Sequence, residues 1–178
     1  IAGVANWTAE FMFGKQRQLT PAEIAEARKI FGDKVDYSQI RIVTGDIGIW
    51  GRIITLGGLP PNSAATSALI NTIYFPGYDP DQRFDQAIFL HEITHVYQDE
   101  THGLMGFEWG KLTGGSGEFV LTPKKSFNDY SFEQQAMIIQ DYYSGQVIPL
   151  KDTDKLRDLT DDEKKLINEM LIKAGLLK

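Results

Sequence analysis

The sequence contains no cysteine and only three histidines among its 178 residues. Without cysteine there can be neither a disulfide nor a thiolate metal ligand, so the fold does not depend on the redox state of its surroundings. No run of 18 apolar residues occurs, so we expect no transmembrane helix. The net charge is −6 and no stripe of Lys and Arg stands out, so a nucleic acid partner is not expected.

The first residues, IAGVANWTAE, lack a methionine, a basic segment and an apolar segment. They predict no signal peptide, and the isoleucine start favours a piece cut from a longer polypeptide. The length, with 42% hydrophobic residues, suits one domain with a substantial core. We expect a single domain over residues 1–178, with a core of about 19–145 and a C-terminal helical extension over 151–178.

Four segments have the apolar spacing and the capping residues of helices. Thr20 and Glu23 form a capping box before the first helix, and Ser131 caps the third. The second helix is the longest and is expected to stop at Gly103. The predicted helices span residues 20–32, 79–103, 131–145 and 160–177.

Runs of β-branched and aromatic residues closed by Gly or Asp predict short strands. These runs span residues 38–46, 48–58, 71–77 and 118–122. Loops are expected at 59–68, which is rich in Pro, Ser and Ala, and at 103–117, a glycine-rich apolar segment that is a candidate lid. This order of elements predicts an α+β fold, with a small sheet packed on the long helix and further helices beside it.

The long helix contains FLHEITHVYQ, in which His91 and His95 lie four positions apart and Glu92 follows the first histidine. Residues i and i+4 share one helix face, so both imidazoles can reach one small ion. Imidazole suits Zn²⁺, and two such ligands are half of a tetrahedral site. Glu92 is placed to hold a metal-bound water and take its proton, which is the HExxH arrangement of zinc peptidases.

The alternative for this pattern is a pair of core histidines that are hydrogen-bonded to the backbone. A chance HExxH is expected in roughly one chain of this size in a few hundred. Burial of two imidazoles and a carboxylate without a metal or partners would cost on the order of several kcal/mol. The spacing inside a buried helix therefore favours a site for one Zn²⁺.

A catalytic zinc keeps three protein ligands and one open position, so a third ligand must come from elsewhere. His102 lies roughly 16 Å beyond His91 along the helix, too far unless the chain bends sharply. A metzincin needs Gly and His where this sequence has Gln98 and Thr101. The remaining candidates are the carboxylates of Glu108, Glu118, Asp129, Glu133 and Asp141. Glu133 differs because it opens a helix, which is a rigid carrier for a ligand.

Four stretches resemble the vgr-related metallopeptidase-like domains of bacteria, which occur alone or fused behind the VgrG spike of type VI secretion systems. The stretches are LTPAEIAEARKIFGDKVDYSQIRI, IYFPGY, FLHEITHVYQ and YSFEQQAMIIQDYY. The resemblance covers roughly residues 19–145, and its most specific parts are HExxHxxQ and EQQA.

The resemblance implies a zincin-like fold and a zinc-dependent peptidase of the gluzincin type. His91, His95 and Glu133 would hold one Zn²⁺, and Glu92 would be the catalytic base. For Glu133, a cap at Ser131 also fits, because the positive end of a helix favours the ionised carboxylate that a metal needs.

For the family members that are fused to a spike, the resemblance implies an antibacterial effector that is secreted into the periplasm of target bacteria. A protein or peptide would be the substrate, and an immunity protein is a candidate partner. Met137 is a departure, since thermolysin-like enzymes carry an Asp there; Gln140 and Asp141 are candidates to support a ligand histidine instead.

Further side chains are candidates for supporting roles. Gln98 shares the face of the histidines and is either a hydrogen-bonding partner near the site or a polar packing residue. The segment 71–78 is either an edge strand that pairs with an extended substrate or a plain structural strand. Candidates for a transition-state donor are His102, Tyr130, Tyr142 and Tyr143, although packing in the core is the commoner fate of aromatic residues.

The predicted reaction is hydrolysis of a protein or peptide amide by water, with Glu92 as the base. Two rival functions stay open. A binding module of the secretion spike would have a closed structural site with four ligands. A zinc amidase would act on the cell wall, and it would cleave peptidoglycan in preference to protein.

Overall fold

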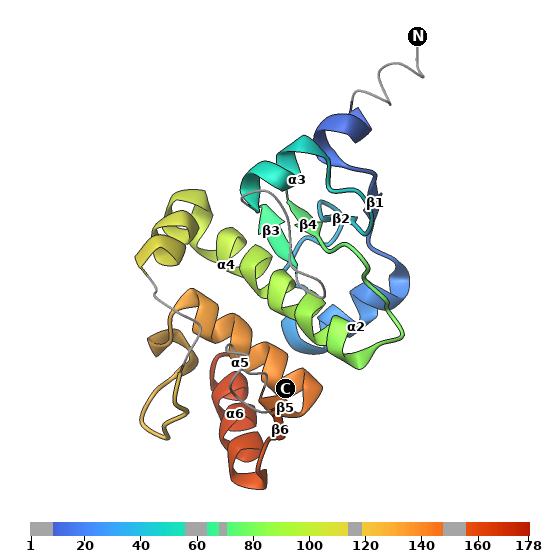
Figure 1. The fold of residues 1–178 in the computed structure, drawn as a ribbon. Helices are drawn as coiled ribbons and strands as arrows, with labels where there is room; N and C mark the ends of the chain where they lie inside the picture. The colour runs from blue at the N-terminus through green and yellow to red at the C-terminus, as the bar shows by residue number, and fades with distance from the viewer. Residues whose placement is uncertain (1–8, 56–63, 68–70, 114–118, 148–155) are drawn as a thin grey trace.

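The computed structural model describes residues 9–55, 64–67, 71–113, 119–147 and 156–178 of the chain (Figure 1). The prediction of an α+β fold is confirmed for these residues. A small mixed sheet lies on one side of the long helix α4, and α5 and α6 lie on its other side (Figure 1). Within the described part of the chain, no helix combines the length and apolar character needed to cross a membrane.

The sheet has four short strands in the order β1-β2-β4-β3. The strands are β1 (Gln16–Gln18), β2 (Arg41–Val43), β3 (Ala65–Ser67) and β4 (Thr72–Tyr74). β2 and β4 are parallel, whereas β1 and β3 run antiparallel to their neighbours. The strands predicted at 38–46 and 71–77 are confirmed as β2 and β4. β4 lies between β2 and β3, so the edge-strand interpretation of 71–78 is wrong, and β3 falls in a segment predicted to be a loop.

The strand predicted at 48–58 is wrong, because Gly48–Ile54 forms the helix α3. One face of this segment packs on the sheet, where Ile47 and Trp50 form a small cluster with Val43 and Tyr74. Gly51 permits the approach, since an added Cβ would lie 2.9 Å from the Tyr74 ring. Burial against the sheet outweighs the β propensity of the isoleucines.

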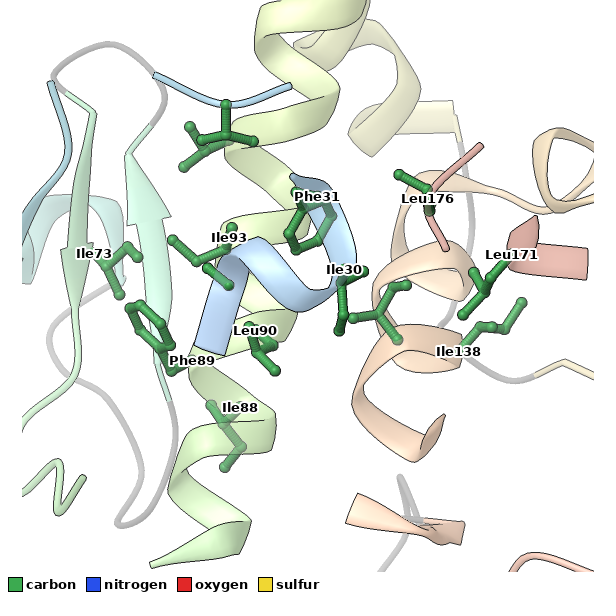
Figure 2. Packing of buried hydrophobic residues seen from close by; sticks show 14 of the residues in the cluster. Ile30, Phe31, Ile73, Ile88, Phe89, Leu90, Ile93, Ile138, Leu171 and Leu176 are labelled. Atoms are coloured by element: carbon green, nitrogen blue, oxygen red, sulfur yellow. The ribbon is translucent and has the colours of Figure 1, made fainter. Parts of the chain in front are cut away.

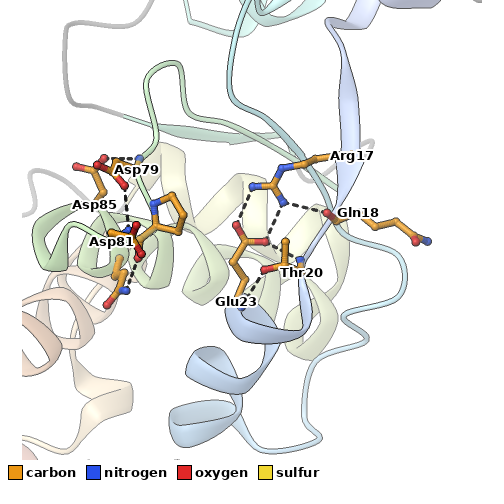
Figure 3. A network of polar contacts seen from close by, with 9 residues as sticks. Arg17, Gln18, Thr20, Glu23, Asp79, Asp81 and Asp85 are labelled. Carbon is orange, nitrogen blue, oxygen red and sulfur yellow. Dashed lines mark hydrogen bonds and ion pairs between the residues drawn. The ribbon is translucent and has the colours of Figure 1, made fainter.

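The first of the predicted helices is confirmed as α2 (Pro21–Phe31), which begins at the capping box predicted from the sequence. Thr20 accepts from the Glu23 amide, and the Glu23 carboxylate accepts from the Thr20 amide at 2.7 Å (Figure 3). Arg17 of β1 donates two hydrogen bonds to the same carboxylate, at 2.9 and 2.7 Å. These bonds join the start of α2 to the edge of the sheet.

The long helix α4 (Arg83–Thr113) is broken at Gly103, where φ is 72° and ψ is 159°. The predicted end of the helix at Gly103 is therefore a kink. The irregular loop predicted for 103–117 is wrong for residues 104–113, because their backbone is helical. Gly106 and Gly110 each weaken a helix by only about 1 kcal/mol relative to Ala, which is too little to exclude it. Residues 114–118 lie outside the described part of the chain.

The strand predicted at 118–122 is also wrong for its described residues, 119–122, which form no strand. Tyr130 organises this segment instead. Phe119 packs on the Tyr130 ring at 5.9 Å, and the Tyr130 hydroxyl accepts from the Thr122 amide. Side-chain packing has replaced strand pairing here.

The predicted C-terminal helices are confirmed as α5 (Phe132–Ser144) and α6 (Asp161–Lys173), with capping boxes that begin at Ser131 and Thr160. A 3-10 turn, η2 (Phe127–Asp129), precedes α5. The two-residue strands β5 (Gln146–Val147) and β6 (Arg157–Asp158) pair antiparallel between the helices. The division into a core of about 19–145 and an extension over 151–178 stays a prediction; α6 side chains share one hydrophobic cluster with α2 and α4.

One hydrophobic cluster connects the sheet to the helices through α4 (Figure 2). Phe89 lies beside Ile73 of β4, and Leu90 and Ile138 are fully buried within the cluster (Figure 2). α4 is thus covered on two sides, and the polar side chains of Glu92, Thr94, His95 and Gln98 in its central part are buried. Buried polar groups of this kind need hydrogen-bond partners.

Candidate metal centre

Two histidines of α4 and one glutamate of α5 meet at the interface between the helices. The rings of His91 and His95 have centroids 4.9 Å apart and are nearly perpendicular. Nε2 of His91 lies 3.6 Å from Oε2 of Glu133, and Nε2 of His95 lies 3.4 Å from Oε1. One ligand atom from each residue lies within 4.8 Å of the other two, so this group could hold a metal ion.

The spacing of these atoms suits a tetrahedral ion. Zinc bonds of about 2.0–2.2 Å in a tetrahedron place neighbouring ligand atoms roughly 3.3–3.5 Å apart. The two nitrogen–oxygen distances, 3.6 Å to Oε2 and 3.4 Å to Oε1 of Glu133, are close to that value, and the ligand atoms of the group all lie within 4.8 Å of one another. Two imidazoles and a carboxylate also form the ligand set that leaves a fourth position for water at catalytic zinc.

The electrostatic environment keeps Glu133 in the form that binds metal. Burial alone would raise the pKa of this carboxyl group, but its interactions with His91 and His95 outweigh burial and hold the pKa below its usual range. The side chain of Glu133 is 29% exposed, whereas that of His95 is 3% exposed. The cluster is therefore closed on the His95 side and more open beside Glu133.

Local packing explains why Glu133 lies beside the histidines. Ser131 caps α5, which places Glu133 in the first turn of the helix. Ala136, Ile138 and Ile139 follow with no exposed surface and hold α5 against the core. The apolar run AMII therefore fixes the helix, and the helix carries the carboxylate to its position.

Glu92 lies on a different face of α4 from the histidines. One residue along a helix is a rotation of about 100°, so Glu92 faces the sheet while His91 faces α5. The Glu92 side chain is buried, and its Oε2 accepts a hydrogen bond of 2.6 Å from the Thr66 hydroxyl of β3. Glu92 is not a member of the three-residue group. Its role as catalytic base stays a prediction.

Gln98 is the hydrogen-bonding partner of a histidine, which was one of its two predicted roles. Its Oε1 lies 2.9 Å from Nδ1 of His95. This is the position for which Gln140 and Asp141 were candidates. By contrast, Nδ1 of His91 is buried and has no hydrogen-bond partner among the described residues.

The other candidate metal ligands lie outside the group or outside the described residues. His102 is exposed and its ring lies against Phe132, with centroids 5.0 Å apart. Asp129 of η2 accepts from the Ser126 amide and lies outside the three-residue group. The side chains of Glu108 and Glu118 lie outside the described residues.

The candidate transition-state donors hydrogen-bond elsewhere. Tyr130 binds the backbone of residues 120 and 122, which is the segment before η2. The Tyr142 hydroxyl donates to Asn168 of α6. The Tyr143 hydroxyl donates to Glu26 of α2 or Gln86 of α4. These contacts give the three tyrosines structural roles at helix interfaces.

Two residues at the site were not identified from the sequence. Thr66 lay in a predicted loop, and no local pattern connects it with Glu92, which is 26 residues away. Gln135 belongs to the EQQA block, but that block gave it no role. Contacts between distant elements are needed to find both residues.

No protein-family profile matches the chain, but comparisons with curated proteins and with solved structures both find similarity to one protein, VgrG2b. The type VI secretion system spike protein VgrG2b of Pseudomonas aeruginosa is 31% identical in an alignment of 135 residues, and the match covers 71% of this chain and 13% of that protein. The solved effector domain of P. aeruginosa VgrG2b aligns with a TM-score of 0.56 and 24% identity over 99% of this chain and 94% of that domain. The chain is homologous to the VgrG2b effector domain and shares its fold.

Proposed function

We propose that this homologue of the VgrG2b effector domain is a single zincin-like domain with zinc metallopeptidase activity of the gluzincin type. The observation that carries the proposal is the convergence of His91, His95 and Glu133 on one point, within 4.8 Å, at the packed interface of α4 and α5. A structural role for a plain carboxylate–histidine contact would not require the HExxH spacing or the adjacent buried Glu92.

In this proposal His91, His95 and Glu133 are the protein ligands of one Zn²⁺. Zinc, when bound, supplies Lewis acidity that activates water and polarises the substrate carbonyl. A set of three protein ligands would leave a fourth position for water, which is the reason to prefer a catalytic site over a closed structural one. The exposure of Glu133 supports access for water from that side.

Glu92 would move the proton during amide hydrolysis. Its carboxylate takes a proton from the water that attacks the carbonyl carbon, and returns it to the amine nitrogen as the carbon–nitrogen bond breaks. The hydrogen bond from Thr66 restrains one carboxylate oxygen and leaves the other for the water. Burial excludes bulk solvent from this transfer.

Measurement of metal content and hydrolysis together tests the proposal. Purified protein should contain about one zinc per chain and cleave fluorescently labelled casein or a mixed peptide library, and it should lose cleavage on chelation and recover it with zinc. Bound zinc without any cleavage would favour the binding module of the spike. Cleavage of peptidoglycan but not of protein would favour the cell-wall amidase.

The proposed site of action is the periplasm of a target bacterium, after delivery by a type VI secretion spike to which the domain is fused or bound. The support is homology to a spike protein, although the chain spans only 13% of the length of that relative. A chain without cysteine also folds without disulfide errors in an oxidising compartment. Expression with a periplasmic leader should harm the host, and expression without it should be tolerated. Equal toxicity in both compartments would reject the assignment.

A further inference from the structure

Two buried glutamines connect His95 to the backbone at the start of α5. Gln98 has no exposed surface and Gln135 is 5% exposed. Nε2 of Gln135 donates to the Tyr130 carbonyl at 2.9 Å. Nε2 of Gln98 donates to Oε1 of Gln135 and to the Phe132 carbonyl, both at 3.0 Å. Oε1 of Gln98 then lies 2.9 Å from Nδ1 of His95.

The direction of this chain is fixed at its far end, because a backbone carbonyl can only accept hydrogen bonds. The Tyr130 carbonyl orients the Gln135 amide, so Oε1 of Gln135 faces Gln98. Gln98 therefore uses both of its amide hydrogens on Gln135 and on the Phe132 carbonyl. Only its oxygen is left to face His95.

The chain therefore determines which nitrogen of His95 carries the proton. Since Oε1 of Gln98 can only accept, Nδ1 of His95 must be the donor. A neutral imidazole has one N–H, so Nε2 keeps its lone pair. That lone pair lies on the side of Glu133, 3.4 Å from Oε1. His91 has no such restraint among the described residues, because its Nδ1 has no partner.

We propose that Gln98 and Gln135 are positioning residues that fix the Nδ1–H tautomer of His95 and thereby set the affinity of the site for its metal. The inference rests on the metal-binding part of the proposed function and not on peptidase activity. The same bonds join α4 to the first turn of α5, so they also hold Glu133 at its distance from the histidines.

Three glutamine-to-methionine variants test the role of the glutamines in metal binding. For each variant, zinc affinity is measured by competition against a chromophoric chelator. Gln98→Met should weaken zinc binding about 10–100-fold, since loss of an outer-shell partner typically has that effect. Gln135→Met should weaken it by less than about tenfold, because the Phe132 carbonyl still orients Gln98. Gln140→Met is the matched control. Gln140 is buried on α5, as Gln135 is, but it is not part of the hydrogen-bonded series that ends at His95, so zinc affinity should stay within about twofold.

Nitrogen NMR of the metal-free protein provides a readout that packing alone would not change. With only three histidines, His95 can be assigned from a single His95→Ala spectrum. In the wild type, at a pH where His95 is neutral, its single N–H should be on Nδ1; in folded Gln98→Met, both tautomers should appear. If Gln98→Met does not fold, the wild-type spectrum still tests the tautomer of His95, and the zinc affinity of Gln135→Met still tests the role of the glutamines.

The outcomes separate this inference from the proposed function. A neutral His95 with its N–H on Nε2 in the wild type, or a folded Gln98→Met with wild-type zinc affinity, would overturn the inference while zinc binding stands. A wild type that binds no zinc would overturn the metal site itself, and the tautomer measured without metal would still test the chain of glutamines.

Discussion

The two sides of α4 differ in how firmly they hold the residues of the site. On the α5 side, His91 and His95 face Glu133, and Gln98 is bonded to Gln135 and to the backbone of α5. On the sheet side, Glu92 accepts a hydrogen bond from Thr66, which among the described residues is its side-chain partner and lies in the three-residue strand β3 at the edge of the sheet. The proposed metal ligands and the proposed base are thus supported by separate parts of the fold.

This separation implies that the proposed metal binding and the proposed proton transfer can be lost independently. Residues in contact or in one hydrogen-bond network couple energetically, whereas residues without shared partners usually act additively. Variants on the α5 side should change metal affinity, and variants on the sheet side should change turnover with the metal still bound. Four substitutions test this, from the largest expected effect to the smallest.

Glu92→Gln should show the largest effect. Removal of a general base typically lowers turnover about 10²–10⁴-fold, and zinc content should stay at the wild-type level because the ligands are unchanged. Casein hydrolysis and metal analysis of the same preparation measure both quantities. Wild-type hydrolysis by this variant would exclude Glu92 as the base.

Glu133→Gln should abolish the response to metal. Zinc at 100 times its Kd stabilises a folded protein by about 2.7 kcal/mol, which is roughly 5–10 °C in Tm for a chain of this length. Thermal melts with and without zinc should show this shift in the wild type and in Glu92→Gln, but not in Glu133→Gln.

Glu118→Gln is the comparison for Glu133, because Glu118 was an alternative ligand from the sequence. Its zinc-dependent shift in Tm should equal that of the wild type. A lost shift in Glu118→Gln with a normal shift in Glu133→Gln would exchange the two assignments.

Thr66→Val should lower turnover about 10–100-fold without loss of zinc, since a hydrogen bond to a charged group contributes about 1.5–3 kcal/mol. Thr66→Ser keeps the hydroxyl and should restore most of the rate. Thr94→Val is the matched control, because the Thr94 hydroxyl is buried on α4 but bonds the Leu90 carbonyl. Equal losses in Thr66→Val and Thr94→Val would indicate a general packing effect.

Thr160→Ala should have the smallest effect on the site. Loss of the cap at the start of α6 should reduce the free energy of unfolding by about 1 kcal/mol, as measured by urea denaturation. Zinc affinity and casein hydrolysis should not change, because α6 packs on α5 and carries none of the residues of the proposed site. A change in either quantity would show that the site depends on the C-terminal helix.

The sequence predicted the elements whose signals are local. The helices at α2, α4, α5 and α6 were found from capping residues and apolar spacing, and the HExxH spacing alone brought His91 and His95 to one face. Glu133 could be placed in the first turn of a helix from Ser131, but its choice over other carboxylates needed the resemblance to a family.

The elements that were missed depend on contacts between distant segments. The isoleucines of α3 suggested a strand, and only packing against Val43 and Tyr74 makes that segment helical. β3 exists because it pairs with β4, and the composition of its own segment predicted a loop. Thr66 could not be connected with Glu92 for the same reason.

The enclosure of α4 has a consequence for how the protein fluctuates. Backbone amides that are buried between two layers exchange with solvent only when a large cooperative unit opens, whereas amides of short edge strands exchange through local opening. Residues 88–96 of α4, with Leu90 and Ile93 fully buried, should therefore show the slowest deuterium uptake in the chain, and β3 a much faster one. The two histidines would then move only when the domain unfolds, while the strand that holds Glu92 can open in the native protein.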